Sequence, residues 1–281
     1  MKKKSILLTG ARGFLGKSVY SHLTNSGYSL IPLVRHTNGL TGEIVLDLEH
    51  GDIESQCSKL PHFDAIIHLA AKADFSSRYD KELFIANTLA TYHLAKLSEK
   101  RNAHCIFASM AGVHGARTSH ITEDSPIKLD TPYSFSKWLA EEALKKICRR
   151  YSIIRFSGIY GPAGPTHLGI NNAISRALNG MPPVLIGEGF ARRNYIFVED
   201  AAIAIENILE KELLGTYLCA GAQELSIREM LYTICNVLIS STEPIKQEGA
   251  EANDQIVESS ALMPRSRPFE EALVAIKNSL L

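Results

Sequence analysis

The sequence lacks a long hydrophobic run and an excess of charge of either sign. Lys plus Arg and Asp plus Glu both total 30 among the 281 residues, so the formal net charge is zero. The broad basic surface that binds nucleic acid is therefore absent. The apolar run Ile6–Leu8 is too short for the roughly 7 to 15 residues of a signal-peptide core, and no stretch reaches the roughly 18 apolar residues of a membrane span. We expect neither a nucleic acid nor a membrane as a partner.

Cysteine and histidine occur without the spacings that make disulfide frameworks or metal sites. The five cysteines include no CxxC pair, and the ten histidines include no HxxxH or HExxH. The odd number and scatter of the cysteines predict reduced, mostly buried thiols in a cytoplasmic protein. No bound metal is predicted. The GxSxG nucleophile elbow of hydrolases is missing as well.

Hydrophobic residues make up 45% of the chain, which is ordinary for a packed protein. Through the first two thirds, short apolar runs alternate with longer amphipathic segments. The predicted strands are Ser5–Thr9, Leu30–Val34, Ile44–Leu46, Ala65–Leu69, His104–Ala108 and Tyr151–Arg155. The predicted helices between them are Lys17–Asn25, Phe84–Lys100 and Ser134–Arg150. This alternation predicts an α/β fold with a Rossmann-type, doubly wound parallel sheet.

The pattern changes after a Gly- and Pro-rich loop at Tyr160–Pro165. Further predicted helices are Ile170–Leu178, Ala201–Glu212 and a last one, capped by Ser226, at Ile227–Ile239. Predicted strands are Val184–Ile186 and Thr216–Ala220, and Ser240–Asp254 is expected to be a polar loop. We therefore predict a Rossmann domain over residues 1–165, to which 195–215 returns, and a smaller C-terminal α/β lobe over 166–281.

The first predicted strand leads into a glycine loop that opens a helix. Its glycines, Gly10, Gly13 and Gly16, have the spacing GxxGxxG. The first permits a tight turn, the second lets a pyrophosphate approach the backbone, and the third allows the helix to pack closely on the strand. The helix N-terminus presents N–H groups and a positive dipole end to phosphates. The loop predicts dinucleotide binding by Gly10, Arg12, Gly13, Phe14, Leu15 and Gly16.

The residues after the second strand bear on which dinucleotide is bound. An NAD site typically places an acidic residue about 20 residues beyond the loop, on the ribose hydroxyl. Here the strand ends in Leu33-Val34-Arg35-His36, without an acid. Arg35, joined by Arg12, suits a 2′-phosphate, so the sequence favours NADP over NAD. Asp47 and Leu48, after the third strand, are expected to border the adenine.

Tyr133 and Lys137 open the helix before the strand Tyr151–Arg155. Positions i and i+4 share one face of a helix, so both side chains can address one site. A nearby ammonium, together with the charge of an oxidised nicotinamide, would lower the pKa of the tyrosine from its usual value near 10. We predict that Tyr133 is a catalytic acid and base and that Lys137 tunes it and holds the nicotinamide ribose, so both residues are also predicted to bind the cofactor.

In combination these motifs resemble the extended short-chain dehydrogenase/reductase family, in its NAD-dependent epimerase/dehydratase branch. The resemblance covers at least residues 5–236. Besides the glycine loop and the Tyr133–Lys137 pair, it is carried by His68–Ala71, Asn87, Arg155–Pro162 and Arg193–Asp200. It implies that the backbone of Leu69, Ala70 and Ala71 lines the cofactor and that Asn87 is structural.

The resemblance also implies partners. The substrate would be a nucleoside-diphosphate sugar, with its diphosphate near Arg193 in the C-terminal, substrate-binding lobe. The alternative for Arg193 is a salt bridge to an acid such as Glu199 or Asp200. Two helices in the middle of the chain would form a homodimer interface.

One departure from the family pattern affects catalysis. The family usually has Ser or Thr five residues before the glycine that ends Val113-His114-Gly115, and here that residue is Met110. Ser109, the residue before it, is the predicted substitute as hydroxyl donor. Losing such a donor typically lowers the rate on the order of a hundredfold or more. The family's 4,6-dehydratases have an Asp-Glu pair where this chain has Ala111-Gly112, so dehydration ranks last.

We therefore predict an enzyme that transfers hydride at a ring carbon of a nucleoside-diphosphate sugar. It is either an epimerase, with no net use of cofactor, or a keto-sugar reductase that consumes NADPH. A different class of protein stays open, namely a catalytically weakened NAD(P)-binding regulator or scaffold.

Overall fold

The first part of the chain folds around a parallel sheet. The computed structural model describes residues 3–37, 39–50, 53–74 and 78–279. It divides into two units, the first made of Met1–Gly115, Ile127–Arg155 and Ala202–Tyr217. In the described part of this unit, strands follow one another in the order β12-β7-β5-β4-β1-β2-β3. Their bounds are β1 Ser5–Thr9, β2 Ser29–Val34, β3 Ile44–Val45, β4 Ala65–His68, β5 His104–Met110, β7 Tyr151–Phe156 and β12 Gly215–Cys219.

The central strands are apolar along their whole length because both faces of the sheet are covered. Ile6, Leu7 and Leu8 in β1 are 0% exposed, as are Ile66 and Ile67 in β4. Such continuous runs are typical of parallel strands. The pairings β1–β2, β1–β4, β2–β3 and β4–β5 are all parallel. The predicted α/β fold with a parallel sheet is confirmed.

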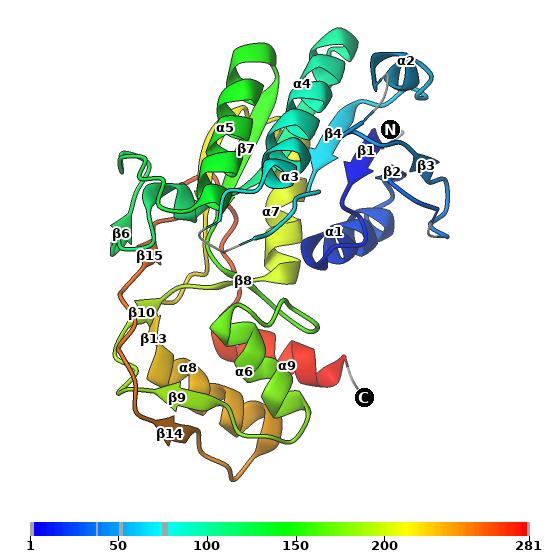
Figure 1. The fold of residues 1–281 in the computed structure, drawn as a ribbon. Coiled ribbons are helices and arrows are strands. Elements are labelled where there is room, and N and C mark those ends of the chain that lie inside the picture. Colours follow the sequence, from blue (N-terminus) through cyan, green and yellow to red (C-terminus); the bar gives the residue numbers. More distant parts are fainter. Residues whose placement is uncertain (1–2, 38, 51–52, 75–77, 280–281) are drawn as a thin grey trace. The chain divides into compact units, whose positions relative to one another are not determined.

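The order of the strands places helices on both faces of the sheet (Figure 1). The chain moves from β1 to β2 in one direction and from β4 to β5 in the other. With right-handed connections, α1 (Phe14–Asn25) and α4 (Ala90–Arg101) then lie on opposite faces. Helix α5 (Pro132–Ile147) packs beside α4, and α2 (Ile53–Ser58) contacts α4 as well. Helix α7 (Val198–Lys211) lies beside α1, where His22 and Glu206 pair at 2.5 Å.

The predicted helix over Phe84–Lys100 is not a single α-helix. The chain forms α3 (Lys81–Phe84), a π-helical turn η1 (Ile85–Leu89) and then α4. A π-turn inserts an extra residue into a helix and is frequent at functional sites. It lies at Asn87, which is buried with 1% exposure. Hydrophobic periodicity alone does not reveal such an insertion.

The second unit comprises Ala116–Pro126, Phe156–Ala201 and Leu218–Leu281. The sequence placed the boundary at residue 165, whereas the structure assigns the strand-to-loop segment from Phe156 to this unit. It contains the two-stranded sheets β8–β11, β10–β13, β9–β14 and β6–β15. Their bounds are β6 His120–Ile121, β8 Ile159–Tyr160, β9 Val184–Ile186, β10 Arg192–Arg193, β11 Ile196–Phe197, β13 Leu225–Ser226, β14 Ile245–Gln247 and β15 Ile256–Val257.

Three helices and a group of aromatic rings fill this second unit. The helices are α6 (Gly169–Leu178), α8 (Ile227–Ile234), which continues as the π-turn η3 (Cys235–Ile239), and α9 (Phe269–Asn278). Tyr160 packs against Phe197 and Phe269, with ring centroids 5.6 and 5.2 Å apart. Helix α9 corrects the prediction that Ile227–Ile239 is the last helix. Strand β14 corrects the loop predicted for Ser240–Asp254, and its three exposed residues explain why hydrophobicity did not indicate it.

Among the described residues, no helix is both long and apolar enough to cross a membrane.

Candidate functional site

The glycine loop connects β1 to α1 with contacts that exclude side chains. Gly10 has φ +72°, and a Cβ there would lie 2.6 Å from the amide nitrogen of Ala70. A Cβ on Gly16 would lie 1.9 Å from the Gly10 carbonyl oxygen. The Gly13 N–H donates to the same oxygen at 2.9 Å. Only glycine fits at Gly10 and Gly16, so the loop is held tightly between α1 and the end of β4.

A cavity of about 710 Å³ lies over this loop, within the range of known ligand pockets. Helix α1 points its N-terminus at the loop and has no acidic residue in its first turn and no side-chain cap at Gly13. Its first N–H groups have no partner within the helix and suit phosphate oxygens. The site therefore fits a dinucleotide pyrophosphate.

Most of the residues predicted to bind cofactor line this cavity. They are Gly10, Arg12, Gly13, Arg35, Leu48, Leu69, Ala70 and Ala71. Phe14, Leu15 and Gly16 form the first turn of α1 instead. Asp47 is not among the lining residues. It braces the turn after β3, accepting from the Glu49 N–H at 2.8 Å and facing His50 Nδ1 at 3.1 Å. These hydrogen bonds outweigh the effect of burial and lower the pKa of Asp47.

The sequence reasoning missed Glu49, which also lines the cavity. Its Oε1 lies 3.1 Å from Arg35 Nη1, and its side chain is 15% exposed against 66% for the arginine. The two residues are 14 positions apart. The parallel pairing of β2 with β3 brings them together, and a search for an acid directly after β2 cannot find it.

Behind the glycine loop, His68 belongs to a buried, neutral hydrogen-bond network. Thr91 Oγ1 donates to the Asn87 carbonyl at 2.5 Å, so it accepts from His68 Nε2 at 3.0 Å. His68 Nδ1 then accepts from Thr9 Oγ1 at 2.7 Å. Thr9 Oγ1 in turn accepts the N–H groups of Leu69 and Ala70, each at 3.2 Å. Burial, and secondarily the charge of Lys137, lowers the pKa of His68 to about 3.

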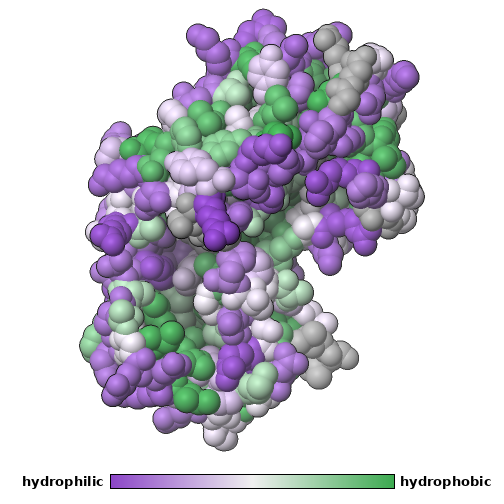
Figure 2. Space-filling view, in the orientation of Figure 1, coloured by the Kyte–Doolittle hydropathy of each residue, from purple (hydrophilic) through white to green (hydrophobic). Residues whose placement is uncertain are grey.

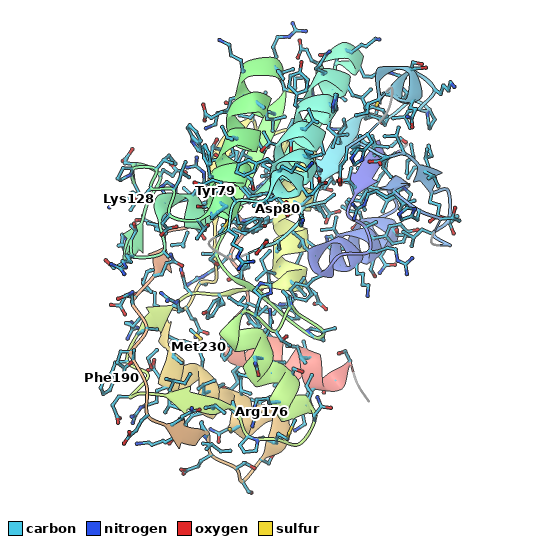
Figure 3. The ribbon with its side chains drawn as sticks, in the orientation of Figure 1. Tyr79, Asp80, Lys128, Arg176, Phe190 and Met230 are labelled. Carbon is cyan, nitrogen blue, oxygen red and sulfur yellow. The ribbon has the colours of Figure 1, made fainter. Side chains whose placement is uncertain are left out.

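Asn87, in the π-turn, ties the cavity wall to α5. Its Oδ1 accepts from the Lys72 N–H at 2.8 Å, and its Nδ2 donates to Ser136 Oγ at 2.9 Å. Lys72 lines the cavity and pairs with Asp80 at 2.5 Å. Asp80 caps the N-terminus of α3 (Figure 3). Asn87 therefore bridges the cavity wall and helix α5, which is how it could fill the structural role predicted for it.

Helix α5 presents Tyr133 and Lys137 on its first two turns. Thr131 caps the helix in a capping box with Ser134, and Pro132 occupies a first-turn position. Lys137 is only 3% exposed, and its Nζ lies 3.9 Å from the centre of the Phe107 ring. Burial lowers the pKa of Lys137 to about 7, and Glu141 partly offsets this.

The pKa of Tyr133 is set by burial in the protein alone. Burial raises the pKa of its phenol to about 12, and the lowered pKa expected from the sequence applies to the site with an oxidised nicotinamide bound. Burial also lowers the charge that the neighbouring lysine carries near neutral pH. In the protein alone Tyr133 is therefore a phenol, and only an added positive charge next to it can favour the phenolate.

Ser109 lies in a buried charged network at the end of β5. It donates to Glu141 Oε1 at 2.5 Å. Glu141 also binds Arg155, with Nη2 to Oε2 at 2.6 Å, and Arg155 Nη1 lies 3.0 Å from His114 Nε2. The hydroxyl proton of Ser109 is thus engaged one helical turn beyond Lys137. Met110, the residue at the expected hydroxyl position, ends β5 and is half-buried.

Arg193, in β10 of the second unit, has a buried guanidinium nitrogen. Its Nη1 has no hydrogen-bond partner among the described residues. Its charge and a hydrogen bond oppose the burial that raises the pKa of Tyr195. The alternative partners for Arg193 are taken by Arg267, which binds Asp200 at 2.7 Å and Glu199 at 3.0 Å.

The part of the chain that the structure describes holds no group of three or more residues able to bind a metal.

A model of the NAD dependent epimerase/dehydratase family matches residues 6–219. The dTDP-glucose 4,6-dehydratase of Neisseria gonorrhoeae is 29% identical, over 98% of this chain and 88% of the relative. The UDP-N-acetyl-alpha-D-glucosaminuronate decarboxylase of Bacillus cytotoxicus is 27% identical, over 86% and 82%. The UDP-N-acetylglucosamine 4-epimerase structure from Bacillus cereus has a TM-score of 0.86 at 23% identity, over 99% of both chains.

Proposed function

The chain belongs to the NAD dependent epimerase/dehydratase family, and from that premise we propose that it is a nucleoside-diphosphate sugar epimerase acting at a ring carbon. One observation carries the proposal. The Tyr133–Lys137 helix is hydrogen-bonded through Asn87 to the wall of a cavity that fits a dinucleotide. A proton-transfer pair and a hydride carrier are thereby held by the same unit.

The chain's own groups divide the chemistry between them. A bound dinucleotide supplies a hydride acceptor and donor. Tyr133, as the phenolate that the positive charge of an oxidised dinucleotide would favour, takes the proton of the sugar hydroxyl as that carbon is oxidised, and the resulting phenol returns the proton on reduction. Lys137, in its ammonium form, adds to the stabilisation of that phenolate from its buried place beside Phe107. Glu141 favours the charged form of Lys137.

Ser109 in the first unit and Arg193 in the second have separate proposed roles. Ser109 remains the hydroxyl donor nearest in sequence to Met110, but it must exchange its bond to Glu141 for one to the sugar. Arg193 binds the sugar-nucleotide diphosphate, because a buried guanidinium nitrogen without a partner suits an anion. The relatives named above act on dTDP- and UDP-linked sugars, and we propose such a nucleotide here.

The direction of net chemistry separates the candidates. A keto-sugar reductase is the second candidate, favoured by Arg12 and Arg35 at the cavity, which suit the 2′-phosphate of NADPH. A dehydratase is disfavoured because Ala111 and Gly112 stand where its acid and base would be. A regulator without turnover is the remaining alternative, favoured by Met110.

We also propose that the protein is a homodimer through α4 and α5. An aromatic row, Tyr79, Phe84, Phe135 and Trp138, has ring centroids 5.7 to 6.3 Å apart. Leu89, which precedes α4, and Tyr92, within α4, are 38% and 39% exposed. Figure 2 shows apolar residues surfacing among polar ones over α4 and α5. Light scattering should give a dimer, which Leu89→Lys with Tyr92→Lys converts to a monomer.

The experiment for the catalytic proposal incubates the protein with UDP-, dTDP- and GDP-linked sugars and follows products by NMR. An epimerase converts one sugar to its epimer without consuming added NADH or NADPH. Stoichiometric consumption of NADPH with a keto-sugar nucleotide would assign the reductase. No turnover of any of these substrates, with dinucleotide bound, would contradict both and leave the regulator.

A further inference from the structure

The ion pair between Arg35 and Glu49 bears on which dinucleotide the site accepts. Both residues line the cavity, and Arg35 follows β2, the position that faces the adenosine ribose in this fold. Glu49 is the more buried partner, with 15% of its side chain exposed against 66% for Arg35. The arginine that the sequence assigns to a 2′-phosphate therefore already has a carboxylate beside it.

The backbone fixes Glu49 in this place. Val34 pairs with Val45, and the Leu46 N–H donates to the Val34 carbonyl at 2.8 Å. The chain then turns, and Asp47 Oδ1 holds the Glu49 N–H at 2.8 Å. The backbone of Glu49 is thus placed at the cavity by β3 and its turn, through hydrogen bonds that do not involve Arg35.

The charged residues that line the cavity show which acid can pair with Arg35. Arg12 and Arg35 both line the cavity, and His36 follows Arg35 in the chain. The other charged lining residues are Lys72, which pairs with Asp80, and Glu82. Glu49 is accordingly the acid in position to act on Arg35.

We propose, on the basis of the proposed function, that Glu49 selects NAD over NADP. Its carboxylate accepts a hydrogen bond from the ribose hydroxyl of NAD, a role that an acid directly after β2 usually has. It repels the 2′-phosphate of NADP, which carries up to two negative charges, and it holds Arg35 away from that phosphate. From the sequence alone Arg35 favours NADP, whereas with Glu49 beside it we expect the site to favour NAD.

The test measures the dissociation constants of NAD⁺ and NADP⁺ by calorimetry for nucleotide-free protein. The variants are Glu49→Gln, Arg35→Met and the double variant, with Glu82→Gln as a control that removes a cavity carboxylate away from Arg35. The wild type is expected to prefer NAD⁺ at least tenfold. Glu49→Gln should lower the dissociation constant of NADP⁺ at least tenfold. Adding Arg35→Met in the double variant should cancel that gain. Glu82→Gln should leave the ratio of the NAD⁺ and NADP⁺ dissociation constants within threefold of wild type.

Each outcome has a distinct meaning. A wild type that prefers NADP⁺, or an NAD⁺/NADP⁺ ratio that Glu49→Gln does not change, overturns the role of Glu49 and leaves the proposed enzyme intact. Equal changes of the NAD⁺/NADP⁺ ratio in Glu49→Gln and Glu82→Gln would show that the overall charge of the cavity causes the effect. This outcome would also overturn the role of Glu49. Failure of the wild type to bind either nucleotide would contradict the proposed function itself.

Discussion

Two buried polar clusters lie close together in the first unit, and they differ in charge. Around His68, each hydrogen bond has a donor and an acceptor, and the imidazole is neutral with a pKa of about 3. Around Lys137, an amine with a pKa of about 7 lies against the ring of Phe107, near the buried acid Glu141. The first cluster braces the glycine loop and the second can exchange a proton near neutral pH. Perturbed pKa values of the second kind are typical of catalytic groups.

The largest effect is expected for Tyr133→Phe, which removes the proposed acid and base. Turnover should fall at least about a hundredfold, while the dissociation constant of the dinucleotide stays within threefold. Steady-state kinetics and calorimetry measure the two quantities. Tyr151→Phe, at the start of β7, is the matched control and should keep wild-type turnover. Equal turnover of Tyr133→Phe and wild type would remove Tyr133 from the mechanism.

Met110→Ser should raise turnover by about tenfold or more, because it restores a hydroxyl at the position where the family usually has one. Met110→Ala is the control, since it removes the thioether without adding a donor. The prediction concerns kcat, and the affinity for dinucleotide should not change. If serine and alanine give the same rate, the missing hydroxyl does not limit this protein.

Gly16→Ala changes the glycine loop, which the His68 cluster braces. Its Cβ would lie 1.9 Å from the Gly10 carbonyl, so the glycine loop must shift, and we expect dinucleotide affinity to fall at least about tenfold. Gly169→Ala at the start of α6 is the control, because nothing lies within 4 Å of its added Cβ. Calorimetric titration and thermal unfolding of both variants separate lost binding from lost folding. Wild-type affinity in Gly16→Ala would contradict the packing role.

Lys137→Met should separate stability from function. In the folded protein the lysine pKa is about 7, below its value in the unfolded chain, so the unfolded chain binds more protons between pH 7 and about 10.5. Wild-type stability therefore rises with pH over that window, by up to about 1.4 kcal/mol per unit. At pH 7 the variant should unfold at a higher denaturant concentration than wild type, with the difference shrinking toward pH 10. A less stable variant at pH 7 would show that Lys137 contributes to folding.

Sequence patterns predicted most of the regular strands and helices of this molecule but missed an irregular turn and the C-terminal helix. Strands such as Ser5–Thr9 and Val184–Ile186 were predicted to the residue, because each is a short apolar run between clear turns. The π-turn at Asn87 was missed because an inserted residue leaves the helical periodicity almost intact. Helix α9 was missed although Phe269, Leu273 and Ile276 are buried at helical spacing.

In the candidate site, the local patterns were predicted from the sequence and the contacts between distant segments were not. The glycine loop and the Tyr133–Lys137 spacing are local, and the structure places them as the local pattern suggests. Glu49 beside Arg35 depends on the pairing of two strands, and the engagement of Ser109 by Glu141 depends on the packing of β5 against α5. The pKa of Tyr133 depends on burial, which the spacing of residues in the sequence does not reveal.

The central claim is that this chain holds a dinucleotide through its catalytic cycle. The most direct measurement is to denature the purified protein and identify the nucleotide that is released by chromatography and mass spectrometry. The account predicts stoichiometric NAD(H). Release of no nucleotide would contradict it, whether or not the protein binds added NAD⁺ or NADP⁺.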